Sequence, residues 1–153
     1  MKRLASLACL PVIIALAVTA CTSANCVEDT DPLVATNIYS SVKKKTVTCD
    51  SIIVTAKSTA GDTIITKEKA VSLFTFTLDP ANTQSTLLFK LDNVTDTVVI
   101  TYTSSPYYIS SACGYTICHR ITALTSTDNI IDSLVLENKS VTLDGKSNLR
   151  LYY

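Results

Sequence analysis

The sequence has few of the residues that usually perform catalysis. It contains one histidine, His119, and three glutamates, Glu28, Glu68 and Glu137, which stand far apart along the chain. General acid–base catalysis needs positioned groups that titrate near neutral pH. With three glycines in the chain, there is neither a glycine-rich phosphate loop nor a Gly-x-Ser-x-Gly turn. We therefore expect no catalytic residue, no cofactor and no enzymatic activity, and we interpret His119 as a partly buried strand residue.

Positive charge is scarce after the first three residues. Without Lys2 and Arg3, the chain has 11 basic and 13 acidic residues and a net charge of −2. Nucleic-acid binding needs a basic face, so we expect no nucleic-acid partner. The single basic run, Lys43-Lys44-Lys45, is interpreted as a solvated turn or strand edge. Contact with lipid head groups beside a membrane anchor is the alternative.

The sequence also lacks a membrane-spanning apolar run, which needs about 20 residues. The uncharged stretch 4–20 has a shorter apolar centre and follows the basic start Met1-Lys2-Arg3, a pattern typical of signal peptides. It ends in Val18-Thr19-Ala20-Cys21, which resembles the lipobox of bacterial lipoproteins. This resemblance implies cleavage before Cys21 and acylation of the new N-terminal cysteine, and several acyl chains anchor a protein firmly.

The proposed tether after Cys21 is short. Residues 22–25, Thr-Ser-Ala-Asn, lack the acidic cluster that follows the acylated cysteine in many surface-exposed lipoproteins of Bacteroidetes. We therefore expect an outer-membrane lipoprotein that faces the periplasm. The expected organisation is a signal peptide over 1–20, a lipidated tether over 21–30 and one domain over 31–153.

The composition after residue 20 favours β-structure. Thr, Val and Ile account for 44 of these 133 residues, and their branched side chains favour strands. Alternation with period two is clearest over 94–102, where Val94, Val98, Ile100 and Tyr102 share one face. Further candidate strands are 33–41, 50–58, 62–67, 74–78, 87–91, 115–124, 131–138 and 149–153. Short strands separated by turn residues predict an all-β, immunoglobulin-like sandwich of seven to nine mostly antiparallel strands. A short helix over 129–136 is an alternative for that segment.

Four cysteines remain after the leader and Cys21 are set aside: Cys26, Cys49, Cys113 and Cys118. An even number in an exported chain predicts two disulfides, for which the sequence allows three pairings. If residues 113–118 form one strand, the two cysteines at its ends point to opposite faces and bond different partners. The spacing of Cys118 and His119 is not typical of a metal site or of a catalytic pair.

Three motifs together resemble a family of small Bacteroidetes lipoproteins of unknown function. They are Cys26-Val27-Glu28, the segment 108–115 with Ala112-Cys113-Gly114-Tyr115 at its end, and the closing 149–153. The family supplies no catalytic residue or ligand. It implies that Cys26 pairs with Cys113, which leaves Cys49 to pair with Cys118 in this member. Gly114 is then expected at a bulge or bend that orients Cys113.

Four Asp-Ser/Thr-apolar triplets resemble the acceptor site of periplasmic O-glycosylation in the same bacteria. The candidate acceptors are Ser51, Thr63, Thr97 and Ser133. The same triplet also describes a strand that begins after a turn. We expect one or two modified sites, with Thr63 the best candidate because it follows the turn Ala60-Gly61-Asp62.

Tyr107 and Tyr108 are the candidate binding residues, because tyrosines stack on sugars and anchor protein partners. We nevertheless favour core packing for them, because seven tyrosines in a chain without tryptophan also serve to fill a core. We expect a lipid-anchored, non-enzymatic binding or accessory module that contacts another envelope protein. The alternative is a glycan-binding lipoprotein with a tyrosine platform, and a hydrolase is the third hypothesis.

Overall fold

The computed structural model describes residues 26–153, and this part of the chain forms ten β-strands without any helix. The leader and Cys21 lie outside the described residues. The prediction of an all-β sandwich is confirmed, with ten strands rather than seven to nine. The segment 129–136 is a loop followed by a strand, so the alternative of a helix there is wrong. Within residues 26–153 the structure has no helix that is long and apolar enough to span a membrane.

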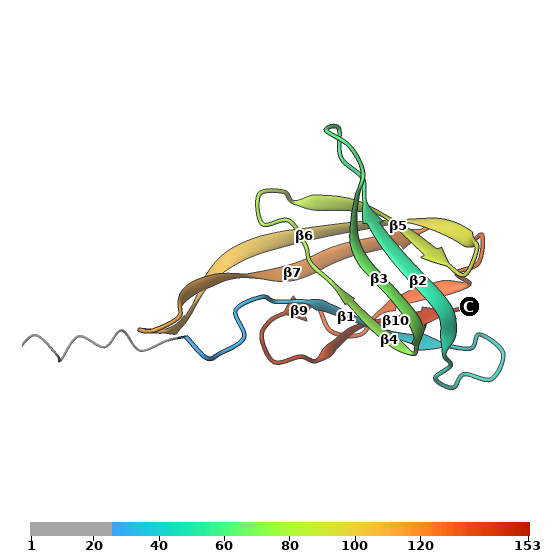
Figure 1. Ribbon diagram of the computed structural model, residues 1–153, viewed down its shortest axis with the longest axis horizontal. Coiled ribbons are helices and arrows are strands. Elements are labelled where there is room, and N and C mark those ends of the chain that lie inside the picture. The colour runs from blue at the N-terminus through green and yellow to red at the C-terminus, as the bar shows by residue number, and fades with distance from the viewer. Residues whose placement is uncertain (1–25) are drawn as a thin grey trace, which may run out of the picture.

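The strands form two facing sheets (Figure 1). The first has the order β4-β1-β10-β8, in which β1 and β10 are parallel and the other pairs are antiparallel. The second is fully antiparallel, with the order β3-β2-β5-β6-β7-β9. The bounds are β1 Val34–Tyr39, β2 Cys49–Ala56, β3 Thr63–Val71, β4 Leu73–Phe76, β5 Gln84–Leu91, β6 Val94–Ser110, β7 Gly114–Ser126, β8 Ser133–Leu136, β9 Ser140–Val141 and β10 Ser147–Tyr152.

The core lies between the sheets and is built from the apolar faces of alternating strands. Phe74 and Phe76 of β4 each meet Phe89 of β5 edge to face, with ring centroids 5.5 Å apart. Such aromatic pairs contribute about 0.5–1.5 kcal/mol beyond the burial of their area. Val98 and Ile100 of β6 are fully buried, as the alternation predicts.

A buried carboxylate secures the loop that leads to the first sheet. Asp96 of β6 is fully buried and accepts a hydrogen bond from the Thr127 hydroxyl at 2.5 Å. It also accepts bonds from the backbone N–H groups of Asn129, Ile130 and Ile131 at 2.8–3.0 Å. Burial alone would raise the pKa of Asp96, but these hydrogen bonds lower it overall. Asp96 therefore fixes the path of the chain from β7 to β8.

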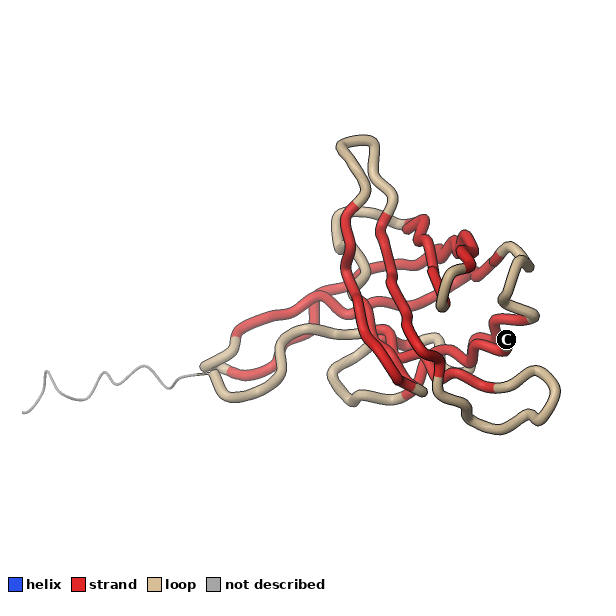
Figure 2. Tube along the Cα trace, turned by 45° about the vertical axis from the view of Figure 1, so that its right-hand side comes forward, coloured by secondary structure: helices blue, strands red, loops and turns tan. Residues whose placement is uncertain are grey.

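The β6–β7 hairpin extends far beyond the sandwich (Figure 2). Along β6, burial alternates as far as Tyr102, and the side chains from Thr103 to Tyr108 are exposed on both faces. The hairpin closes at Gly114, whose φ of +71° lies in the left-handed region that favours glycine. A register shift between Tyr108 and Ser110 marks a bulge there, in agreement with the bend expected beside Cys113. We call residues 103–118 the ribbon.

Candidate functional site

The N-terminal segment 26–33 is fastened to the ribbon at two points. Cys26 and Cys113 form a disulfide with their Cα atoms 4.7 Å apart, so this predicted pairing is confirmed. The Thr116 hydroxyl donates a hydrogen bond to the Thr30 carbonyl at 2.5 Å. A two-stranded ribbon is only marginally stable by itself in water. These two fastenings therefore stabilise the ribbon and fix where the chain enters the domain.

The expected second disulfide is wrong, because Cys49 and Cys118 are buried free thiols. Cys49 begins β2 and Cys118 lies in β7, with β5 and β6 between them in the same sheet. Three strand spacings separate these strands by about 14 Å, whereas disulfide geometry requires Cα atoms within about 7 Å. Burial raises the pKa of both thiols and keeps them protonated.

A cleft of about 570 Å³ opens where the ribbon meets the sandwich, and we call it the His119 cleft. Its walls come from the N-terminal segment, the loop between β4 and β5, the first half of β7 and single residues or pairs from β2, β3 and β5. The polar and aromatic lining residues are Asp31, Thr77, Asp79, Ser85, Tyr115, Thr116 and His119. Clefts of this size accommodate small ligands or side chains of a partner.

His119 is held as a structural group in this cleft. Its Nδ1 lies 2.9 Å from the Ser104 hydroxyl, and its ring meets Tyr102 edge to face at 5.4 Å. Tyr102 is itself fixed, since its hydroxyl donates to the Asp79 carbonyl at 2.8 Å. Burial lowers the pKa of His119, although the Asp79 carboxylate opposes that shift. Among residues 26–153 no hydrogen bond joins His119 to a carboxylate, although Asp79 lines the same cleft.

The predicted tyrosines lie on the ribbon and are exposed. Tyr107 and Tyr108 are adjacent on β6, and Tyr108 pairs across the ribbon with Tyr115 of β7. The rings of Tyr108 and Tyr115 are 5.2 Å apart and inclined by 61°. The favoured interpretation of Tyr107 and Tyr108 as core residues is therefore wrong. Tyr115 also lines the His119 cleft, but the inclined rings do not form the coplanar platform that would favour a sugar ligand.

A second cleft of about 480 Å³ lies on the other side of the N-terminal segment, and we call it the leucine groove. Leu33 and Leu73 are among its lining residues and are partly exposed. Glu28, Asp29 and Asp31 also line it, and its lining includes no basic residue. Asp31 borders both clefts, so the N-terminal segment is their common wall. The sequence interpretation missed this groove because its three leucines, Leu33, Leu73 and Leu143, lie far apart along the chain.

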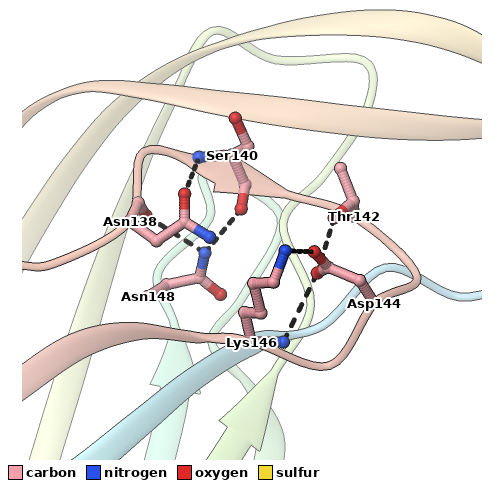
Figure 3. A network of polar contacts seen from close by, with 6 residues as sticks. All are labelled: Asn138, Ser140, Thr142, Asp144, Lys146 and Asn148. Atoms are coloured by element: carbon pink, nitrogen blue, oxygen red, sulfur yellow. Dashed lines mark hydrogen bonds and ion pairs between the residues drawn. The ribbon is translucent and has the colours of Figure 1, made fainter.

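Hydrogen bonds order the loop between β9 and β10 (Figure 3). This loop contributes Thr142 and Gly145 to the lining of the leucine groove. The Thr142 hydroxyl donates to Asp144 at 2.7 Å, and Lys146 pairs with Asp144 at 2.8 Å. These contacts lower the pKa of Asp144 to about 2. Nearby, the buried Asn148 amide donates to the carbonyls of Asn138 and Ser140, and its oxygen accepts from the Ala35 N–H. The wall of the groove is thus tied to β1 and β10.

Side-chain exposure separates the four candidate glycosylation acceptors. Thr63 and Ser133 are exposed at the starts of β3 and β8. Ser51 and Thr97 are half-buried within β2 and β6. The Asp96 that precedes Thr97 is also fully engaged in its own hydrogen bonds. Access therefore favours Thr63 and Ser133.

The lysine run 43–45 is exposed in the loop between β1 and β2, which confirms the interpretation as a solvated turn. This loop lies at the opposite end of the molecule from Cys26 (Figure 1). The alternative, in which these lysines meet lipid head groups beside the anchor, therefore disagrees with the fold. Among the described residues, no cluster of three or more His, Cys, Asp or Glu side chains could bind a metal ion.

These features define a β-sandwich domain with an N-terminal segment stapled to a projecting ribbon and a cleft on each side of that segment. The chain belongs to the family of unknown function DUF6452, whose match covers residues 51–153. That match includes the ribbon and Cys113 but not Cys26. The expectation of a family of unknown function is thus confirmed. No curated protein and no solved structure matches the chain.

Proposed function

We propose that this chain is a lipid-anchored, non-enzymatic module of the bacterial outer membrane that faces the periplasm and binds another envelope protein. The lipobox at Val18–Cys21 supports the anchor and the compartment. The disulfide supports export, because disulfides persist in oxidising compartments. The scarcity of histidine and glutamate supports binding rather than catalysis, because general acid–base catalysis needs positioned groups that titrate near neutral pH.

The leucine groove is the surface that favours a protein partner. An apolar floor with a polar, charged rim is the usual anatomy of a protein interface. Here the floor includes Leu33 and Leu73, and the rim carries Glu28, Asp29 and Asp31. Charge complementarity therefore selects a partner segment that presents apolar side chains flanked by lysine or arginine.

Site-specific photo-crosslinking in intact cells tests this proposal. A photoreactive amino acid replaces Leu73, which is 44% exposed on edge strand β4, in the full-length chain. The matched control is Val135, which is 45% exposed on β8 at the other edge of the same sheet. We expect a heterologous protein adduct at position 73 that is absent at position 135. Recovery of uncrosslinked chain alone, or the same adducts at both positions, would contradict the proposal.

The charge of the rim gives a second test in the same assay. Asp29→Asn removes one acidic group from an exposed position and leaves the leucines in place. We expect a weaker adduct at position 73 and an unchanged yield at an unrelated position.

Acylation is tested separately with Cys21→Ser, which should abolish acyl-chain labelling and release the protein from the membrane fraction. Retention of the label in this variant would contradict lipidation at Cys21.

A glycan ligand is the second candidate, favoured by the position of Tyr115 on the border of the His119 cleft. A single tyrosine ring can stack on one sugar face, and nearby hydroxyl and carboxylate groups can bind its hydroxyls. If envelope oligosaccharides bind, Tyr115→Ala should weaken binding and Tyr107→Ala, which lies outside the cleft lining, should not. Equal loss in both variants would count against the cleft as the binding site.

O-glycosylation remains part of the proposal for Thr63 and Ser133, the two exposed acceptors. Intact-mass spectrometry of chain purified from its native envelope tests it. We expect added hexose mass that is reduced in Thr63→Ala. An unmodified mass would refute glycosylation.

A further inference from the structure

Several exposed apolar residues of the described chain lie together at one end. Val27, Tyr107, Tyr108 and Tyr115 are four of the ten large hydrophobic side chains that are exposed among residues 26–153. All four lie near the closed end of the ribbon, where Cys26 is bonded to Cys113. We call this set the tyrosine tip. Contact with water does not favour exposing these four apolar side chains together on one surface.

The chain length before the described residues limits how far the tip can be from the anchor. Five residues lead from Cys21 to Cys26, and a fully extended chain of that length spans at most about 18 Å. Because the disulfide fixes Cys26 to the end of the ribbon, an acylated Cys21 brings this end to the bilayer surface. The ribbon tip then lies within about 18 Å of the lipid head groups.

The chemistry of the ribbon suits that layer. From Thr97 to Cys118 the sequence contains no acidic or basic residue, so insertion would not desolvate a charge. Tyrosine is enriched at membrane–water interfaces, where its ring meets apolar groups and its hydroxyl stays hydrated. Tyr108 is two residues from the terminal pair Ser110–Gly114, or about 7 Å along the strand. Interfacial segments enter the bilayer by a similar depth of about 5–10 Å.

We propose that the tyrosine tip of the ribbon inserts into the head-group layer of the membrane that holds the lipid anchor. This inference rests on the proposed acylation of Cys21. The ribbon then acts as a spacer, since the eight residue-to-residue steps from Tyr102 to Ser110 extend about 27 Å. Glu28 and Asp29 lie close to the same surface, so a zwitterionic bilayer should accept the tip better than an anionic one.

Tryptophan fluorescence tests this directly, because the natural chain contains no tryptophan. Full-length protein carrying Tyr108→Trp is purified from membranes and reconstituted in phosphatidylcholine vesicles. Tyr115→Trp is a second probe of the tip. Val42→Trp is the control, because Val42 is 88% exposed in the loop at the opposite end of the molecule. We expect blue-shifted emission and several-fold stronger quenching by brominated lipid for the two tip probes than for the control.

Vesicle flotation and intact mass separate the two proposals. If the protein floats and carries acyl mass, but the tip probes are quenched no more than Val42→Trp, tip insertion is refuted and the lipid anchor stands. If the acyl mass is absent and the protein does not float, both proposals fail. Equal quenching in vesicles with added phosphatidylglycerol would refute the predicted preference for zwitterionic lipid. Urea unfolding confirms that each variant is folded.

Discussion

Replacement of Asp96 by Asn should destabilise the domain by about 3–6 kcal/mol. The buried carboxylate accepts four hydrogen bonds, three of them from backbone N–H groups. The asparagine side chain keeps one oxygen, and its NH₂ group faces donors where an acceptor is needed. Two bonds to a charged acceptor are lost, at about 1.5–3 kcal/mol each. Small domains have total stabilities of about 5–15 kcal/mol, so the loss is a large fraction.

The pH dependence of the same variant identifies the carboxylate as the cause. The pKa of Asp96 is lowered in the folded protein, so the folded state binds fewer protons than the unfolded state in the acid range. The stabilisation is therefore complete above the unfolded pKa of about 3.9 and is lost as pH falls through the folded pKa. The stability difference between wild type and Asp96→Asn should narrow from pH 7 to pH 3.

Urea unfolding at several pH values measures both effects, provided that the dependence on urea concentration is the same in the two proteins. Asp128→Asn is the matched control, because Asp128 is an exposed carboxylate in the same loop. It should have little effect. A loss below about 1 kcal/mol for Asp96→Asn, or a difference from wild type that stays constant with pH, would refute the reasoning.

Three further predictions concern the cysteines and Asn148. Removal of the Cys26–Cys113 bond, which closes a sequence separation of 87 residues, should lower the free energy of unfolding by up to about 4–5 kcal/mol in urea titrations; no change would show that the bond does not constrain the unfolded chain. The thiols of Cys49 and Cys118 should react with an aromatic disulfide reagent only after unfolding, and rapid native-state reaction would contradict their burial. Asn148→Ala should cost about 2–4 kcal/mol by calorimetry, because it leaves the buried Ala35 N–H without its partner.

The strands of the sandwich could be predicted from sequence wherever one face is buried. Over 94–102 the alternation correctly placed Val98 and Ile100 in the core. The same pattern ends at Tyr102, because beyond it the ribbon leaves the sandwich and neither face is covered. Asp96 falls on the core face of that alternation, and a carboxylate at such a position is a usable signal of a buried, hydrogen-bonded group.

The strand order could not be predicted from the sequence. The wrong prediction of a Cys49–Cys118 disulfide follows from that. Alternation indicates the face to which a side chain points, but not how many strands separate two positions. Cys49 and Cys118 satisfied the parity argument, although two strands lie between β2 and β7. The leucine groove was missed for a similar reason. Leu33 and Leu73 line one groove only because β4 pairs with β1, two segments that are far apart along the chain.

The position of the N-terminal segment would link the proposed lipid anchor to both clefts. The segment is fixed to the ribbon by the disulfide and by Thr116, and its Asp31 borders the His119 cleft and the leucine groove. If the tip rests on the bilayer, the clefts lie about 30 Å or less above it, given the extent of the ribbon. A partner that fills the leucine groove must then reach into this layer, so we expect it to be a membrane-associated protein. Soluble partners would have no such geometric reason to meet the groove.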